Sequence, residues 1–209
     1  MISIAEARRL YDGADAVHDF DHVLRVLKLA ERIARAENAD PQVVRAAVLL
    51  HDVGRRQAEA AGVDHAMVAA RRAREILVGH PPMKVEKVVE AVATHRFRTK
   101  PKPSTLEARV LYDADKLDAI GAVGVARAFA YGGAHGQRLW APIESVDLER
   151  WQGEGDDADT HTPVHEFVVK LSRIKDRLYT AAGRAIAAER HDYMVAFFER
   201  LAQEVEGAV

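Results

Sequence analysis

Apolar residues recur along most of the chain at the three- and four-residue spacing of amphipathic helices. In the segment FDHVLRVLKLAERIARAE, residues 20–37, one helical face carries only apolar side chains: Val23, Val26, Leu27, Ala30, Ile33 and Ala34. No stretch alternates convincingly with the two-residue period of a half-buried strand. The pattern therefore predicts an all-α fold, and we expect a bundle of about six to nine helices.

Capping residues mark the starts of three of these helices. The segment SIAE fits a capping box in which Glu6 reaches back to the Ser3 amide. Asp40 precedes Pro41 at the start of PQVVRAAVLLHDVG, where proline suits the first helical position and glycine the stop. Asp64 opens DHAMVAARRAREILVG, which we expect to be helical to its end.

The second half of the chain divides around one long irregular segment. From Thr105 the sequence predicts a long helix, open to an interruption, that closes at Gly132 and Gly133. Residues 132–163 then change character, and irregular segments of this length are usually functional loops. After that loop we expect helix to resume and to continue through residues 164–207.

Composition adds limits on the class of protein. A chain of 209 residues suits one domain, here 1–209 with the core motifs in 18–131. Charged residues make up 30% and the formal net charge is -2, so neither a nucleic-acid nor a membrane partner is expected. The apolar runs are shorter than the ~20 residues of a membrane-spanning helix, and without a secretory leader we expect a cytoplasmic protein. The absence of cysteine excludes disulfides, thiolate metal sites and cysteine nucleophiles.

The apolar stretch RAAVLLHDVGRR contains two adjacent titratable residues, His51 and Asp52. Burying both without partners costs free energy because each loses its hydration. Either the two hydrogen-bond each other at a helix end, or a cation lies between them. His22, near the start of a predicted helix, and Asp115, in LYDADKLDAIGA, add a second imidazole and a second carboxylate. Such a set suits a divalent ion, with Mn, Co, Ni, Fe, Zn or Mg all open.

This order of residues, a histidine, a His-Asp doublet and an aspartate, resembles the HD-domain metal-dependent phosphohydrolases. The segments HDFDHVLRVLKLAERIA, AAVLLHDVGR, DHAMVAARRAREIL, VATHRFR and LYDADKLDAIGAVGVARAF are similar to those of the small stand-alone HD hydrolases. The likeness covers most of residues 15–205. It implies an HD-type helical fold and a metal ion held by His22, His51, Asp52 and Asp115.

The resemblance also separates two neighbouring aspartates. The last ligand of the family precedes a Lys/Arg-Leu pair, as Asp115 precedes Lys116, so Asp115 is preferred over Asp113. Two residues correspond to about 200° around a helix, and both aspartates therefore cannot face one ion. We expect Asp113 to start its helix. Asp118, one turn after Asp115, could orient a ligand or contact substrate from the same face.

Two further histidines, His65 and His95, lie between the doublet and the last aspartate. In HD proteins with two metals, two histidines in this interval bind the second ion. Similarity to the stand-alone group favours one metal, with His65 and His95 acting on the phosphate side as catalytic residues. Arg25, Arg96 and Lys116 are the candidate phosphate-binding cations, and each also has the simpler reading of a solvated charge.

The resulting hypothesis is a phosphohydrolase in which metal-activated water, oriented by Asp52, attacks a phosphate ester or anhydride bond. The substrate class is a nucleotide or another small phosphorylated metabolite. Two alternatives stay open: a cyclic-nucleotide phosphodiesterase with two metals, and a nucleotide-sensing HD protein without turnover. The sequence also leaves the oligomeric state open, a homodimer included.

Overall fold

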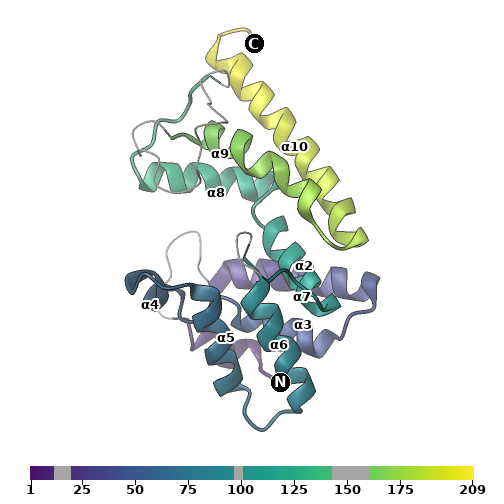
Figure 1. Ribbon diagram of the computed structural model, residues 1–209. Helices are drawn as coiled ribbons and strands as arrows, with labels where there is room; N and C mark the ends of the chain where they lie inside the picture. The colour runs from purple at the N-terminus through teal and green to yellow at the C-terminus, as the bar shows by residue number, and fades with distance from the viewer. Residues whose placement is uncertain (12–19, 97–100, 143–160) are drawn as a thin grey trace. The chain divides into compact units, whose positions relative to one another are not determined.

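The computed structural model describes residues 1–11, 20–96, 101–142 and 161–209 (Figure 1). Within these ranges the chain forms ten α-helices and one 3-10 helix, and no strand. The all-α prediction is confirmed. Most of the predicted loop 132–163 lies outside the described residues, and its first three residues belong to a helix.

Contacts between Cα atoms divide the chain into two compact units. Unit 1 comprises Met1–Lys116 and Leu178–Gly183, and unit 2 comprises Leu117–Arg177 and Arg184–Val209. All the predicted metal ligands belong to unit 1. The expectation of one domain over 1–209 stays a prediction.

Unit 1 is built around a central helix, α3 (Pro41–Leu50), most of which is buried. Its helices are α1 (Ile4–Arg8), α2 (Phe20–Glu37), α3 (Pro41–Leu50), α4 (Arg55–Ala60), α5 (His65–Ile76), α6 (Pro82–Thr94) and α7 (Leu106–Leu117). Seven of the ten residues of α3 are buried, and α3 packs against α1, α2, α5 and α6. Within α3 only Gln42 and Arg45 have polar side chains, and the titratable doublet follows the end of the helix.

The predicted caps are present, whereas α3 ends earlier in the chain than the sequence predicts. Ser3 and Glu6 form the capping box of α1, and Asp40 accepts a hydrogen bond from the Gln42 backbone N–H at 2.9 Å. The helix α3 ends at Leu50, before the doublet. The chain turns there through Gly54, whose φ of 82° lies in the left-handed region that favours glycine.

Unit 2 contains α8 (Gly121–Ala134), α9 (Pro163–Val169), the 3-10 helix η2 (Leu171–Arg177) and most of α10 (Ala181–Val205). Aromatic rings join these helices, with Phe167 stacked on Phe198 at a centroid distance of 4.3 Å. The predicted long helix is interrupted between α7 and α8. Gly121 restarts it with a φ of 78°, and a Cβ at that position would lie 2.9 Å from the Arg190 side chain.

The helices predicted in residues 164–207 are α9, η2 and α10 in the structure, and the start of α10 depends on Asp113. Asp113 is fully buried in the middle of α7, so the expectation that it starts its helix is wrong. Its carboxylate accepts hydrogen bonds from the backbone N–H groups of Tyr179 and Thr180, at 2.9 and 2.7 Å, and from the Thr180 hydroxyl at 2.6 Å. This carboxylate satisfies the orphan donors that precede α10, and so fastens 178–183 to unit 1.

Asp113→Ala is expected to lower the free energy of unfolding by about 3 kcal/mol, because two buried backbone N–H groups lose their acceptor. Urea denaturation of wild type and variant measures the loss. Glu199→Ala, which removes an exposed carboxylate from α10, is the matched control and is expected to change stability little. Equal losses in the two variants would contradict the anchoring role of Asp113.

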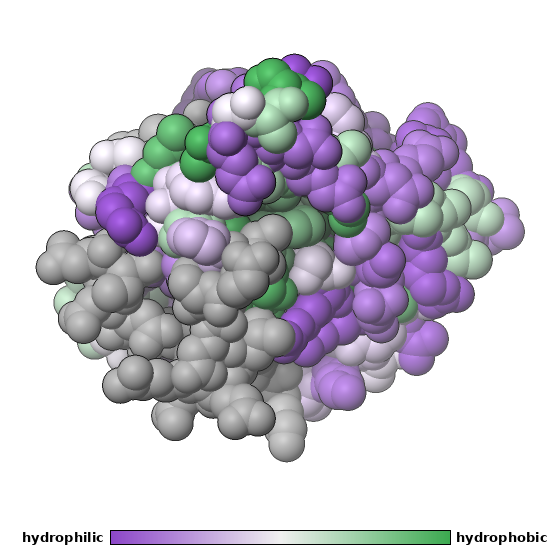
Figure 2. All heavy atoms as spheres, turned by 90° about the horizontal axis from the view of Figure 1, so that it is seen from above, coloured by the Kyte–Doolittle hydropathy of each residue, from purple (hydrophilic) through white to green (hydrophobic). Residues whose placement is uncertain are grey.

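Hydrophilic residues cover most of the described surface on the face that Figure 2 shows, with smaller hydrophobic areas between them. None of the helices in the described ranges is long and apolar enough to cross a membrane. The large hydrophobic side chains that are exposed are spread over several elements.

Candidate metal centre

The predicted ligands and catalytic histidines of unit 1 come from five helices. They are placed near helix ends: His22 in the first turn of α2, His51 and Asp52 after α3, His65 at the start of α5, His95 after α6, and Asp115 in the last turn of α7. All but Asp115, which is half-buried, are buried. The structure therefore brings these residues into the interior of one unit.

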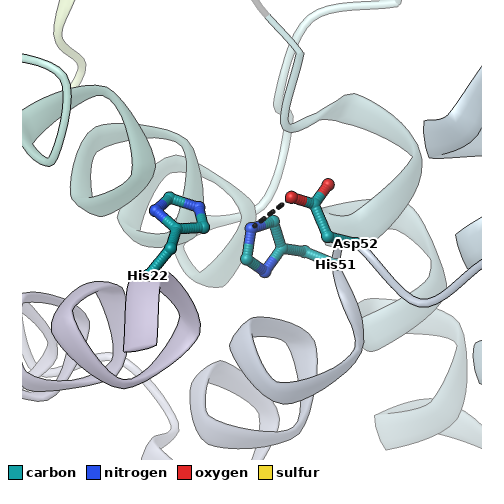
Figure 3. A group of neighbouring side chains, drawn as sticks. All are labelled: His22, His51 and Asp52. Carbon is teal, nitrogen blue, oxygen red and sulfur yellow. Dashed lines mark ion pairs between the residues drawn. The ribbon is translucent and has the colours of Figure 1, made fainter. Parts of the chain in front are cut away.

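The carboxylate of Asp52 lies at the middle of this cluster. Its Oδ2 is 3.6 Å from His51 Nε2, and its Oδ1 is 3.6 Å from His65 Nε2 and 3.7 Å from His95 Nε2. These distances are longer than hydrogen bonds. In Figure 3, His22 approaches His51 from α2, and the dashed line joins His51 to the Asp52 carboxylate.

Asp52 thus belongs to two groups of ligand atoms. His22, His51 and Asp52 form one group, and Asp52, His65 and His95 form the other. Within each group the ligand atoms lie within 4.8 Å of one another. Each group has the donor types that suit a divalent ion, two imidazole nitrogens and a carboxylate oxygen.

Backbone carbonyls fix which nitrogen of two histidines faces the cluster. His51 Nδ1 donates to the Val48 carbonyl at 2.7 Å, and His95 Nδ1 donates to the Val92 carbonyl at 2.6 Å. A carbonyl oxygen only accepts, so Nδ1 carries the proton in both rings. The Nε2 atoms, which face Asp52, are left to act as ligands, as in histidines whose second nitrogen is held by a carbonyl.

Burial sets the charge states in the cluster. Burial lowers the pKa of His51 to about 4 and that of His65 to about 3, although the nearby Asp52 carboxylate acts in the opposite direction. Both rings are therefore neutral at pH 7. Burial alone would raise the pKa of Asp52, but His51, His95 and Arg55 hold it well below its usual range. An ionised carboxylate consequently faces neutral imidazoles.

Two buried side-chain atoms of the described residues have no hydrogen-bond partner: His51 Nε2 and Asp52 Oδ1. The Nε2 lone pair of His51 lies 3.6 Å from Oδ2 of the ionised Asp52 carboxylate, and the two repel each other. The low dielectric of the interior strengthens the repulsion. A cation between them removes that cost. The C-terminal ends of α3 and α6, at His51 and His95, add negative partial charge that favours a cation. The cluster fits a divalent metal ion.

Asp115 adjoins the first group through His22, whose Nε2 lies 3.4 Å from Asp115 Oδ1. Asp113, two residues earlier, is bonded to Tyr179 and Thr180 instead. The two aspartates therefore serve different neighbours, as their spacing on one helix predicts.

Comparisons with known proteins agree with this geometry. The model of the HD domain family matches residues 19–120. The uncharacterized protein YpgQ of Bacillus subtilis is 33% identical over 196 residues, which cover 91% of this chain and 85% of that protein. The chain belongs to the HD-domain family.

Solved structures of relatives extend the likeness of this HD protein over nearly its whole length. The crystal structure of Bacillus subtilis YpgQ in complex with ADP has 28% identity and a TM-score of 0.73, covering 98% of this chain and 99% of that one. An HD-superfamily hydrolase from Bacillus thuringiensis has 26% identity and a TM-score of 0.72, covering 97% and 94%. A predicted HD-superfamily hydrolase from an uncultured Thermotogales bacterium has 30% identity and a TM-score of 0.64, covering 96% and 88%. The family and these neighbours support a metal-dependent hydrolase.

The predicted phosphate-binding cations of the HD protein have partners within the chain. Lys116 Nζ lies 2.6 Å from Asp115 Oδ2, and Arg96 Nη1 lies 3.0 Å from Asp64 Oδ1. Arg25 is half-buried on α2, one turn after His22. All three charges thus lie on elements that carry cluster residues.

Asp118 lies outside unit 1, in the first residues of unit 2. It is buried, and its carboxylate accepts a hydrogen bond from Arg127 Nη1 at 2.9 Å. Both residues belong to unit 2. The predicted role of Asp118 beside the ligands or the substrate stays a prediction.

Sequence reasoning missed two residues that contact the end of α3 and the doublet. Arg55 Nη1 lies 3.2 Å from Asp52 Oδ2, and the three-residue spacing between them was a usable signal. Tyr11 donates its hydroxyl to the Leu49 carbonyl at 3.1 Å. No local spacing marks that contact, since 38 residues separate the partners.

Mn²⁺ is expected to stabilise the metal-free HD protein by about 2.7 kcal/mol when the free ion is 100-fold above its dissociation constant. Asp52→Asn keeps the shape of the side chain but removes its charge, so Mn²⁺ should stabilise this variant far less. Thermal unfolding with and without Mn²⁺ measures both gains.

Glu31→Gln is the control for this measurement, because Glu31 lies on the same helix as His22 and pairs with Arg45 at the surface. It should keep the full gain. A gain in Asp52→Asn equal to that of wild type would place the ion elsewhere.

Proposed function

We propose that this HD protein is a metal-dependent phosphohydrolase that cleaves phosphate ester or anhydride bonds of a nucleotide or small phosphorylated metabolite. The observation that carries the proposal is the buried cluster in which His51 Nε2 and Asp52 Oδ1 have no hydrogen-bond partner. The ADP complex of YpgQ supports a nucleotide as the substrate class. Cations on neighbouring elements supply the charge complementary to phosphate.

The residues that would hold the ion are His22, His51, Asp52 and Asp115. They provide two imidazoles and two carboxylates from α2, the end of α3, and α7. When bound, a divalent ion supplies Lewis-acid polarisation of a phosphoryl oxygen and a water of lowered pKa.

The other residues of the cluster act on water and phosphate. Hydrolysis forms a bond between the water oxygen and phosphorus and breaks the bond between phosphorus and the leaving oxygen. Asp52 orients the water. His95 Nδ1 donates to the Val92 carbonyl, so the imidazole of His95 would take up the water proton at Nε2, and His65, which also faces Asp52 Oδ1, would hydrogen-bond a phosphate oxygen or take up that proton. The leaving oxygen takes up a proton from solvent.

Lys116, Arg96 and Arg25 are proposed to bind the phosphate oxygens. Lys116 pairs with Asp115, and Arg96 pairs with Asp64, the residue before His65; both pairs support a role for these cations beside the cluster. Arg suits bidentate phosphate contacts, whereas Lys acts as a point charge. The same charges would also neutralise part of the negative charge of a nucleotide.

The test is turnover of nucleoside mono-, di- and triphosphates with Mn²⁺, Co²⁺ or Mg²⁺, with products separated so that phosphate and pyrophosphate release are distinguished. At least one substrate is expected to be hydrolysed by wild type. His51→Gln and Asp52→Asn should lower kcat by more than about 100-fold. Loss of a residue that only holds a metal ligand in place already lowers activity about 10- to 100-fold, and loss of the ligand itself should lower it further. Glu31→Gln should retain wild-type turnover.

Nucleotide binding without hydrolysis by metal-loaded wild type would contradict the enzymatic proposal and favour the nucleotide-sensing alternative. Isothermal titration with a non-hydrolysable nucleotide analogue distinguishes that case from a protein that binds no nucleotide at all.

A second candidate function follows from the second group of ligand atoms, Asp52, His65 and His95. Two ions sharing Asp52 would favour a phosphodiesterase acting on cyclic nucleotides. Metal analysis should then give two ions per chain in wild type and one in His65→Ala. One ion in both proteins would contradict the two-metal alternative and leave His65 on the phosphate side.

A further inference from the structure

The hydroxyl of Tyr11 takes the place of a backbone N–H donor at the end of α3. It donates to the Leu49 carbonyl at 3.1 Å. In a continuing helix that carbonyl would accept from the Val53 N–H, but Val53 bonds Leu50 instead, at 3.2 Å. Tyr11 therefore satisfies a carbonyl that the turn at the doublet leaves open, two residues before His51.

The ring of Tyr11 makes a second contact, to the start of α2. It packs edge-on against Phe20, with ring centroids 5.2 Å apart and an interplanar angle of 66°. Phe20 is buried and lies two residues before His22. The Arg8 guanidinium, from the end of α1, lies 4.4 Å from the centroid of the Phe20 ring. Tyr11 thus touches both elements that carry the first group of ligands.

A phenol with its ordinary pKa is a neutral donor at pH 7, and the surroundings of Tyr11 do not change this. Burial raises the pKa of Tyr11 well above its usual value, and the Asp52 charge acts in the same direction. A hydrogen bond from the Asp52 backbone acts the other way without reversing the shift. Tyr11 consequently remains a neutral hydrogen-bond donor.

We propose that Tyr11 is a positioning residue of the metal centre, which fixes the end of α3 against the start of α2. The spacing of His22 and His51, whose ring centroids lie 5.4 Å apart, depends on how these two elements meet. Metal sites require their ligands to be held within about 0.5 Å, and loss of a supporting contact weakens metal binding about 10- to 100-fold. The proposal rests on the metal-dependent function proposed above.

The experiment uses Co²⁺, whose visible absorption reports ligand geometry, with the full chain. Tyr11→Phe keeps the ring contact with Phe20 and removes only the hydroxyl. It is expected to weaken Co²⁺ binding about 10-fold and to alter the visible spectrum. Phe20→Leu removes the ring contact from the other side and keeps the hydroxyl bond, so it is a second variant with an expected loss in the same direction.

Val43→Ala is the matched control, because Val43 is fully buried near the other end of α3. It should lower the unfolding temperature but leave Co²⁺ affinity and spectrum as in wild type. A lowered unfolding temperature in Tyr11→Phe with unchanged affinity and spectrum would overturn the positioning role. Absence of Co²⁺ binding by wild type would overturn the metal-dependent function itself, so the two failures are distinguishable.

Discussion

The carboxylate of Asp52 is buried among three imidazoles and the guanidinium of Arg55, and most of unit 1 is arranged around it. Its ionised form faces the Nε2 lone pair of His51 across 3.6 Å without a proton between them. Such an arrangement costs free energy in a low-dielectric interior unless a cation is added. The neighbouring elements therefore have to hold groups that, without a metal, would tend to separate.

Helix termination is the device that brings these groups together. The last five residues of α3, 46–50, are apolar and buried, and the polar pair of His51 and Asp52 follows where the helix stops. His95 follows α6 in the same way, and in both cases a carbonyl three residues earlier fixes the tautomer. Tyr11 and Arg55 contact this turn and stabilise the end of α3, where the last carbonyl groups have no partner within the helix.

The helix α7 shows how one element serves two purposes. Asp113 faces the backbone of 178–183 and secures the start of α10, whereas Asp115 faces His22. The two-residue spacing directs the carboxylates to opposite sides. Asp113 thus stabilises the start of α10, whereas Asp115 lies beside the His22 ring of the cluster.

The sequence by itself determined the all-α class, the caps at Ser3, Asp40 and Asp64, and the grouping of His22, His51 and Asp52, because periodicity, capping and motif order are local or ordered along the chain. It misplaced Asp113 and did not locate the break at residues 178–180, since the carboxylate that binds the backbone there lies 67 residues away along the chain. The contacts of Tyr11 with Leu49 and of Arg96 with Asp64 were likewise decided only by tertiary structure. The partner of such a side chain lies far away along the chain and comes near it only when the protein folds, so the local sequence does not indicate which residue it is.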